Sequence, residues 1–262
     1  MRVRLVQTHA ALDPAANRAL ISAATDASDP AVDLVVFPEA MARDFGPSGA
    51  SMAAFAESLT GPFADALGRA SERSGVAVAA GMFEINPDDP ARPFNTLALA
   101  HPPVAGTAGT LTTYRKVHLY DSFGFKESDA VTAGALTPVV TDVAGVRLGL
   151  MTCYDLRFPE MARRLIDAGA QALVIPAAWV AGPRKVEHWE TLLRARAIEN
   201  LCFVIAVGQC GAKYVGHSQV ISPYGDVVAS LANDPGVLEV DIDPTEVEAA
   251  RVANPSLANR RW

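Results

Sequence analysis

Strand-like and helix-like patterns of apolar and polar residues follow one another along most of the chain. Runs in which apolar and polar residues alternate, and short uninterrupted apolar runs, predict strands. Segments with apolar residues three or four positions apart predict helices, and Asp, Pro or Gly marks where such helices begin or end. The predicted strands are 2–7, 33–39, 76–83, 95–100, 110–120 and 172–176, and the predicted helices are 13–27, 60–75 and 186–200.

The segment GVRLGLMTCYDLRFPEMARRLIDAG (145–169) predicts an apolar strand followed directly by an amphipathic helix. Cys153 stands at the junction, and Pro159 fits the first turn of the helix, where its missing N–H does no harm. Beyond residue 200 the pattern changes to strands separated by short turns, of which SPYGD is a hairpin signal. These later strands are 202–210, 217–222, 225–230 and 237–243.

The pattern also predicts how the elements are organised. The helix 186–200 is predicted to carry its apolar residues on one face. Those residues are Val186, Trp189, Leu192, Leu193 and Ile198. No low-complexity linker or short-period repeat divides the chain. A single α/β domain over residues 1–262 is therefore expected, with mixed sheets covered by helices on the outside.

Composition excludes several classes of protein. The 262 residues are 50% hydrophobic and 19% charged, which predicts an ordered chain with a large core. A formal net charge of −7 gives no basic field toward nucleic acid or an anionic membrane surface. Three cysteines without C-x-x-C spacing favour neither a disulfide framework nor a cysteine zinc site. Because no signal-peptide pattern or membrane-length apolar run is present, a cytoplasmic location is expected.

Two charged residues lie in or beside predicted strands. Glu39 follows the apolar run VVFP, where a buried carboxylate would need a partner, but it can also end the strand at the surface. Lys116 lies in TTYRKVHLYD, whose alternation puts Tyr114, Lys116 and His118 on one face of the strand. That face either points inward or is solvated. Taken alone, each charge is more readily explained as a solvated position.

Cys153 differs because its position at a strand-to-helix junction has chemical consequences. The N–H groups and positive dipole end of a helix N-terminus favour a thiolate and can hold an oxyanion. The alternative is a buried structural thiol. That alternative describes Cys202 and Cys210 well, because both flank the apolar run FVIAVG without a charged neighbour. Cys153 is therefore the candidate nucleophile.

Other kinds of chemistry have no motif in the chain. None of the five histidines carries a local signature that joins it to Cys153 in a papain-like pair. His, Cys, Asp and Glu do not cluster at metal-ligand spacing. Neither a phosphate-binding loop nor a dinucleotide fingerprint is present. No metal and no other cofactor is therefore expected.

Taken together, VVFPE, YRKVHLYD and GLMTCYDLRFPE resemble the motifs of the nitrilase superfamily of carbon–nitrogen hydrolases. Glu39, Lys116 and Cys153 stand in that family's order of catalytic residues. The resemblance extends to GFKES, HWETLLRARAIEN and GHSQVISPYGDVVA. It implies a four-layer α-β-β-α sandwich that forms a homodimer or a larger homo-oligomer, with the helix 189–198 and the tail PSLANRRW as candidate surfaces. It also implies that Glu127, in GFKES, positions the lysine.

The mechanism that the resemblance implies agrees with the chemistry of these residues. Cys153 attacks the carbonyl carbon of an amide, and Glu39 carries the thiol proton to the leaving ammonia. Lys116 and the backbone N–H of Tyr154 stabilise the oxyanion. Glu39 then activates the water that hydrolyses the thioester to a carboxylic acid.

Within the superfamily, CYD and RARAIENLCFVIAVGQCG resemble the amidase branches, which include the ω-amidases and the deaminated-glutathione amidases. The run AGPRKVEHW departs from both branches, so Trp179 and the loop 181–188 are candidates for substrate selection. A nitrilase or an N-carbamoyl hydrolase built on the same three residues is an alternative. A non-catalytic interaction protein that keeps the fold is a further one.

Arg157 carries the hypothesis about the substrate. It follows Cys153 by four residues, and its planar guanidinium suits both oxygens of a carboxylate. A small carboxylate-bearing amide is therefore the predicted substrate. The alternative is that Arg157 pairs with Asp155 or Glu160 and only holds the turn.

Overall fold

Two six-stranded sheets face each other in the computed structural model, which describes residues 1–26, 31–47 and 49–261. The strand orders are β14-β1-β2-β3-β4-β5 and β13-β12-β11-β10-β9-β8. The first sheet consists of β1 (Arg2–Gln7), β2 (Leu34–Val36), β3 (Ala77–Glu84), β4 (Phe94–His101), β5 (Thr110–Arg115) and β14 (Gly236–Asp241). The second sheet consists of β8 (Val140–Val143), β9 (Val146–Leu150), β10 (Ala172–Ala177), β11 (Phe203–Gly208), β12 (Gln219–Ile221) and β13 (Val227–Ser230).

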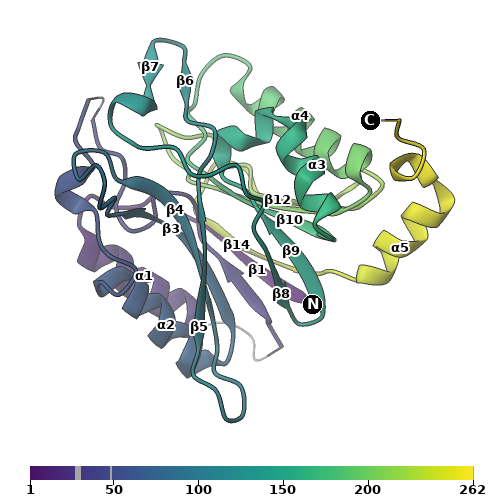
Figure 1. The fold of residues 1–262 in the computed structure, drawn as a ribbon, viewed down its shortest axis with the longest axis horizontal. Coiled ribbons are helices and arrows are strands. Elements are labelled where there is room, and N and C mark those ends of the chain that lie inside the picture. The colour runs from purple at the N-terminus through teal and green to yellow at the C-terminus, as the bar shows by residue number, and fades with distance from the viewer. Residues whose placement is uncertain (27–30, 48, 262) are drawn as a thin grey trace.

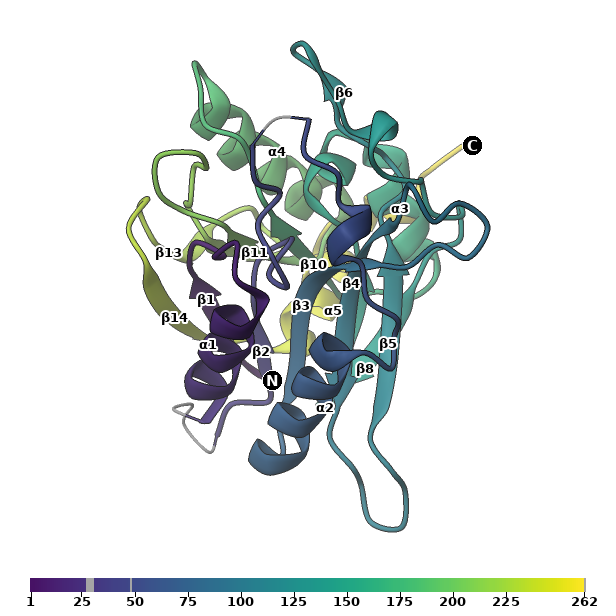
Figure 2. The same ribbon diagram turned by 90° about the vertical axis from the view of Figure 1, so that its left-hand side faces the viewer.

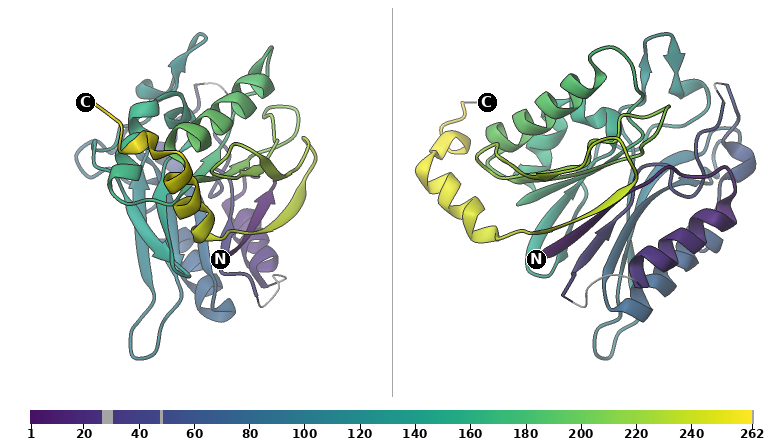
Figure 3. Two further views of the ribbon diagram at one scale, coloured as in Figure 1. Left: turned by 90° about the vertical axis from the view of Figure 1, so that its right-hand side faces the viewer. Right: turned by 180° about the vertical axis from the view of Figure 1, so that it is seen from behind.

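Helices cover the outer face of each sheet. In Figure 1, α1 and α2 lie against the first sheet, and α3 and α4 lie against the second. Figure 3 shows α5 beyond the edge of the two sheets, next to the C-terminus. The helices are α1 (Pro14–Asp26), α2 (Pro62–Ser74), α3 (Pro159–Asp167), α4 (Lys185–Asn200) and α5 (Pro244–Ala253). The order helix, sheet, sheet, helix confirms the predicted four-layer sandwich.

Both sheets follow the same order of pairing. In the first sheet β1, β2 and β3 are parallel neighbours, and in the second β9, β10 and β11 are; the outer strands pair antiparallel. The carboxyl ends of such parallel strands are where open α/β sheets gather functional groups. Here the segments that follow β2, β9 and β10 meet between the sheets, as the contacts described below show.

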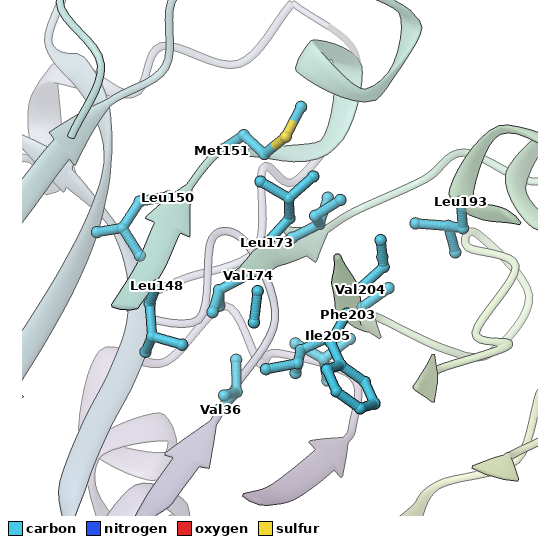
Figure 4. Packing of buried hydrophobic residues seen from close by; sticks show 14 of the residues in the cluster. Val36, Leu148, Leu150, Met151, Leu173, Val174, Leu193, Phe203, Val204 and Ile205 are labelled. Atoms are coloured by element: carbon cyan, nitrogen blue, oxygen red, sulfur yellow. The ribbon is translucent and has the colours of Figure 1, made fainter. Parts of the chain in front are cut away.

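Apolar side chains from the inner faces of the two sheets form the central core. Val36 of β2 faces Leu148, Val174 and Ile205 of the second sheet (Figure 4). A second core lies between the first sheet and its helices, where Ile21 and other apolar residues are fully buried. Burial of one such side chain is worth about 1.5–3 kcal/mol. The two cores therefore fix the strand ends that carry the site.

Some elements differ from the sequence prediction. The predicted strand 110–120 stops at Arg115, because the backbone of Lys116 bonds to Asn95 and then turns to Gly134. The short strand β8, the hairpin β6–β7 (Asp121–Ser122 and Phe125–Lys126) and α5 were not predicted. The predicted helix 13–27 corresponds to α1, and its residue 27 lies outside the described residues.

The prediction that Ile198 shares one face of α4 with Trp189 and Leu193 is wrong, since Ile198 is 49% exposed whereas the other two side chains are buried. Near the end of α4 the inward positions are polar instead, because the guanidinium of Arg196 donates to the carbonyl of Leu156 at 3.1 and 2.8 Å. None of the described helices is long and apolar enough to cross a lipid bilayer.

Candidate active site

Glu39 lies in a buried turn directly after β2. Only 1% of the residue is exposed. One carboxylate oxygen accepts hydrogen bonds from Asn95 Nδ2 at 2.7 Å and Lys116 Nζ at 3.0 Å, and the other accepts from Ala178 N at 2.7 Å. The Glu39 carbonyl accepts from Gln209 Nε2 at 2.8 Å. Hydrogen bonds from segments of both sheets therefore hold the carboxylate. The interpretation that Glu39 ends the strand at the surface is wrong.

The turn that holds Glu39 passes very close to β3, and only glycine fits there. A Cβ on Gly81 would lie 2.5 Å from Ala40 N and 2.7 Å from Glu39 Cα. Gly81 also donates to Pro38 O and accepts from Ala42 N, so turn and strand are bonded to each other. The strand thus sets the height of the Glu39 backbone above the sheet.

We expect Gly81→Ala to lower kcat/KM, because the new methyl group pushes the Glu39 turn away from β3. A misplacement of about 1 Å costs on the order of 100-fold in rate. Steady-state kinetics and thermal unfolding measure the effect. Gly68→Ala is the matched control, because Gly68 is exposed in α2 with open space at its Cβ position. It should leave kcat/KM unchanged and stabilise the fold by about 0.5–1 kcal/mol. Equal kinetics for both variants would contradict this account of the turn.

Lys116 follows β5 and is 2% exposed. Its ammonium lies between two carboxylates, 3.0 Å from Glu39 Oε1 and 2.9 Å from Glu127 Oε2. Glu127 is held in turn by Asn95 Nδ2 at 3.2 Å and by Tyr120 N at 2.7 Å. Burial lowers the pKa of Lys116, but attraction to Glu127 and Glu39 outweighs it and raises the pKa well above its usual value. The ammonium therefore stays charged at neutral pH.

Cys153 is the first residue of a short 3-10 helix, Cys153–Arg157, and adopts a left-handed backbone with φ of 49°. The residue is 7% exposed. Burial and the neighbouring Glu39 carboxylate raise the pKa of the thiol well above its ordinary value, although Lys116 acts in the opposite direction. The expectation that a helix N-terminus favours the thiolate is therefore wrong in its net effect. The Glu39 carboxylate that raises this pKa is instead the group that can accept the thiol proton.

A buried carboxylate that the sequence analysis did not single out fixes the cysteine turn. Asp155 accepts hydrogen bonds from Tyr114 Oη at 2.6 Å, Thr152 N at 2.9 Å and both the backbone and Nδ1 of His118 at 3.0 and 2.8 Å. Tyr114 and His118 stand on either side of Lys116 in the chain. The network therefore joins the segment that carries the lysine to the segment that carries the thiol.

Arg157 ends the same 3-10 helix and does not pair with Asp155 or Glu160. Its guanidinium carbon lies 4.7 Å above the Trp179 ring and 5.8 Å from the Tyr154 ring. The Nε and Nη2 atoms are buried and have no hydrogen-bond acceptor among the described residues. The interpretation of Arg157 as an ion-paired support of the turn is therefore wrong, because Asp155 is already occupied by other donors.

The four residues predicted to be catalytic thus lie together, and the three predicted to bind substrate adjoin them. Trp179 follows Ala178, whose N–H binds Glu39, and Tyr154 follows Cys153. Sequence reasoning missed Asn95, Gln209 and Asp155. A polar residue in the buried strand NTLALA was a usable signal for Asn95. Gln209 offered no such signal, because its role is defined only by the contact with the Glu39 turn.

Other candidate chemistries find little support in the described part of the chain. No group of three or more His, Cys, Asp or Glu residues lies close enough there to hold a metal ion. Cys202 and Cys210 are fully buried, as predicted. Burial raises the pKa of Cys202 to about 12, so this thiol is inert at neutral pH.

An α-β-β-α sandwich with a thiol, a carboxylate and an ammonium buried between its sheets defines a class of carbon–nitrogen hydrolases. The sequence profile of the carbon-nitrogen hydrolase family matches residues 2–252. Deaminated glutathione amidase of Escherichia coli O157:H7 is 41% identical over 233 residues, which are 88% of this chain and 86% of that protein. The chain therefore belongs to the carbon-nitrogen hydrolase family.

Solved structures of this family have the same fold. A CN-hydrolase superfamily protein from Xanthomonas campestris, with an arsenic adduct in its active site, matches with a TM-score of 0.88 at 30% identity over 100% of this chain and 97% of that chain. A mutant of the amidase from Nesterenkonia sp. AN1 shows the Michael addition of acrylamide at its active-site cysteine. It matches with a TM-score of 0.78 at 30% identity over 97% of each chain. The likeness to an amidase thus covers nearly the whole fold.

Proposed function

We propose that this protein is an amidase that hydrolyses a small carboxylate-bearing amide through a thioester on Cys153. The observation that carries the proposal is the shared Glu39 carboxylate. It binds the Lys116 ammonium at 3.0 Å and lies beside the Cys153 thiol, and all three residues are buried. Burying two opposite charges and a thiol together is costly unless they compensate one another, and a reaction that uses all three explains the arrangement.

In the proposed first half-reaction, Cys153 Sγ attacks the carbonyl carbon while its proton passes to Glu39. The raised pKa of the thiol supports this coupling, because little thiolate exists before the carboxylate takes the proton. Lys116 and the backbone N–H of Tyr154 stabilise the oxyanion. Glu39 then protonates the leaving nitrogen, which departs as ammonia or an amine, and the acyl group remains as a thioester.

In the second half-reaction, Glu39 accepts a proton from water, whose oxygen attacks the thioester. The carboxylic acid leaves, and the proton returns to Cys153. Glu127 has a positioning role, since its Oε2 accepts hydrogen bonds from Lys116 Nζ at 2.9 Å and from Tyr120 N at 2.7 Å. The same three central residues suit a nitrile or an N-carbamoyl substrate, but the amidases among the relatives favour an amide.

Arg157 supports the carboxylate-bearing class of substrate. Its two buried nitrogens without an acceptor are donors that a substrate carboxylate can satisfy. The name of the Escherichia coli relative, deaminated glutathione amidase, agrees with an acidic amide. We therefore propose a dicarboxylic mono-amide or a deaminated peptide as the substrate, with Trp179 as the wall against which Arg157 stacks.

Arg157→Lys tests this substrate class. We expect KM for acidic amides to rise about tenfold or more, because an ammonium cannot replace a bidentate contact worth roughly 1.5–3 kcal/mol. KM for neutral amides should change little. The measurement is the rate of ammonia release from glutaramate, which is acidic, and from butyramide, which is neutral. The nitrile and the N-carbamoyl compound that correspond to each amide are assayed in parallel. Equal losses for both amides would show that Arg157 only supports the fold, and faster turnover of the nitrile would favour the alternative reaction.

We also propose that two copies associate through the outer face of α4. Ile198 lines a hollow of about 510 Å³ there together with the exposed Val227 of β13. The tail that was predicted to cover another surface already binds its own chain, since Arg260 pairs with Asp167 of α3 at 2.6 Å. The exposed side of α4 is thus the stronger of the two predicted candidates.

Ile198→Glu should shift the protein toward a monomer, because it places a charge in the proposed contact. Light scattering over a range of concentrations measures the shift. Val104→Glu is the control, since Val104 is also an exposed apolar residue, in the loop after β4. An unaltered chain that is monomeric at every concentration would overturn the proposed association.

A cytoplasmic location is part of the same proposal. All three cysteines are free and buried, and a chain with free thiols suits a reducing compartment.

A further inference from the structure

Lys185 is a buried cation without a carboxylate partner. It is the first residue of α4 and is 8% exposed. Its ammonium binds the neutral phenol of Tyr120 at 3.0 Å and lies 3.9 Å from the centre of the Phe123 ring. Among the described residues no Asp or Glu oxygen lies within salt-bridge distance of it. An ammonium has three N–H donors, so one hydrogen bond leaves capacity for an acceptor.

The position of Lys185 is fixed relative to the reacting groups. Its carbonyl accepts a hydrogen bond from Trp179 Nε1 at 3.0 Å. Trp179 directly follows Ala178, whose N–H binds Glu39 at 2.7 Å. On the other side, the Tyr120 ring that receives the ammonium packs edge-on against Tyr154, the residue after the nucleophile. Lys185 therefore belongs to the wall of the active site.

The hairpin β6–β7 forms the other side of this contact. Figure 2 shows β6 projecting from the end of the molecule at which α4 begins. Tyr120 and Phe123 belong to this hairpin and its approach, and Tyr120 N also binds the Glu127 carboxylate at 2.7 Å. The contacts of the Lys185 ammonium are thus a phenol and aromatic faces, which attract a cation but do not neutralise it.

Two cationic residues without a carboxylate partner therefore contact Trp179 in the wall of the active site. The second is Arg157, which stacks on Trp179 and leaves two buried nitrogens without an acceptor. Withdrawing a cation from water is costly unless an anion compensates it. Since the chain carries a net charge of −7, the two unpaired cations are a local feature of this wall. Anions supplied by the substrate are the natural partners of both.

We infer that Lys185 binds a second anionic group of the substrate and so selects amides that are charged on both sides of the scissile bond. The inference rests on the proposed amidase function and on Arg157 as the residue that holds the acyl carboxylate. An acyl group that already ends in that carboxylate leaves the amine portion as the place for the second anion. The leaving group is then an amine that carries a carboxylate, as in an N-acyl amino acid.

Four matched amides test the inference. N-glutaryl-glycine and N-glutaryl-glycinamide differ only in the charge on the amine side, and N-butyryl-glycine and N-butyryl-glycinamide repeat the pair without the acyl carboxylate. KM and kcat are measured for the unaltered enzyme, Lys185→Met and Lys185→Arg. Lys185→Met keeps the length and apolar stem that pack against Phe123. Lys126→Met is the control, because Lys126 is an exposed lysine of the same hairpin that pairs with Asp129.

Lys185→Met should raise KM for the two glycine compounds about tenfold and leave KM for the two glycinamides within about twofold. Lys185→Arg should retain most of the preference, and Lys126→Met should match the unaltered enzyme. A fall in kcat of similar size for all four amides would overturn the inference and make Lys185 a support of the hairpin. Such a result would leave the amidase function intact.

Binding measured without turnover separates the two proposals. Titration calorimetry with Cys153→Ala should find N-glutaryl-glycine about tenfold tighter than N-glutaryl-glycinamide, and Lys185→Met in that background should remove the difference. Equal binding of the two compounds to Cys153→Ala would overturn the role of Lys185. If the unaltered enzyme hydrolysed none of the four amides, the proposed function would fail on these substrates, while the calorimetry would still decide whether Lys185 recognises the second carboxylate.

Discussion

Replacing Cys153 by alanine is expected to abolish amide hydrolysis while leaving the fold intact. Removal of a nucleophile from a coupled catalytic set costs on the order of 10⁴-fold or more in kcat. The thiol makes no hydrogen bond that the backbone needs, and its neighbours are fixed by other contacts such as Asp155 to Thr152 N at 2.9 Å. Kinetics and thermal unfolding of the variant measure the two effects. Substantial residual turnover would remove Cys153 from the mechanism.

Cys202→Ala is the matched control for that experiment. Cys202 is fully buried, so its replacement should lower the unfolding temperature slightly and leave kcat unchanged. Alkylation by iodoacetamide provides a second measurement, because Cys153 is 7% exposed and should react before the other two thiols, which are fully buried. Since its pKa is raised, the thiolate fraction grows as pH increases, and the alkylation rate should climb through the alkaline range. A rate that is flat above neutral pH would contradict the raised pKa.

Local sequence patterns predicted the strands that lead to the catalytic residues, but not by themselves the catalytic roles of Glu39 and Lys116. Glu39, Cys153 and Trp179 each come directly after an apolar strand of the central parallel groups, and such strands are readily predicted from an uninterrupted apolar run. Lys116 was less certain from alternation alone, because the strand that leads to it ends at Arg115. The resemblance of the motifs, rather than periodicity, identified these residues as one site.

The residues that hold the site in place were harder to predict, because they act across long stretches of chain. Asn95 binds Glu39 over a separation of 56 residues, and Gln209 binds the same residue over 170. The polar residue in NTLALA signals that Asn95 needs a partner but not which one, and Gln209 carries no such signal. Similarly, the strand pattern of 237–243 predicted β14 but not its place in the first sheet beside β1, since alternation does not specify which sheet a strand joins.

The direction in which the pKa of the Cys153 thiol shifts also could not be predicted from the sequence. A cysteine at a helix N-terminus predicts a stabilised thiolate. The helix, however, is a 3-10 helix of five residues, and α3 begins only at Pro159. Burial and the Glu39 carboxylate therefore dominate and raise the pKa of Cys153. Burial of the thiol, followed by the nearby Glu39 carboxylate, therefore keeps the thiol protonated at neutral pH.

Glu39→Gln and Lys116→Ala are expected each to remove most of kcat, and the double variant is expected to be little worse than either. Both residues serve the same step, and losses within such a unit are strongly non-additive. The two side chains also share one hydrogen bond of 3.0 Å, so removing either partner disturbs the other. Steady-state kinetics of the single and double variants measure the coupling. If the fold-loss in kcat of the double variant equalled the product of the two single losses, the residues would act independently.

The same variants should differ in stability, which provides a check on the geometry. Lys116→Ala leaves two buried carboxylates, Glu39 and Glu127, without their shared cation, and breaking a buried pair in this way costs about 3–5 kcal/mol. Glu39→Gln keeps Glu127 as a partner for the ammonium and should cost less. The exposed pair Asp142 and Arg147 is the control, because its removal should cost at most about 1 kcal/mol.

The pH dependence of this contribution follows from the direction of the lysine's pKa. Because the pKa of Lys116 is raised in the folded protein, its stabilising effect is fully present below the ordinary lysine pKa of 10.5 and is lost only as pH rises through the higher folded value. The stability gap between the unaltered enzyme and Lys116→Ala should therefore stay constant from neutral pH to about pH 10 and shrink above it. A gap that already shrinks near neutral pH would show that Lys116 is not held as a charged ammonium between Glu39 and Glu127.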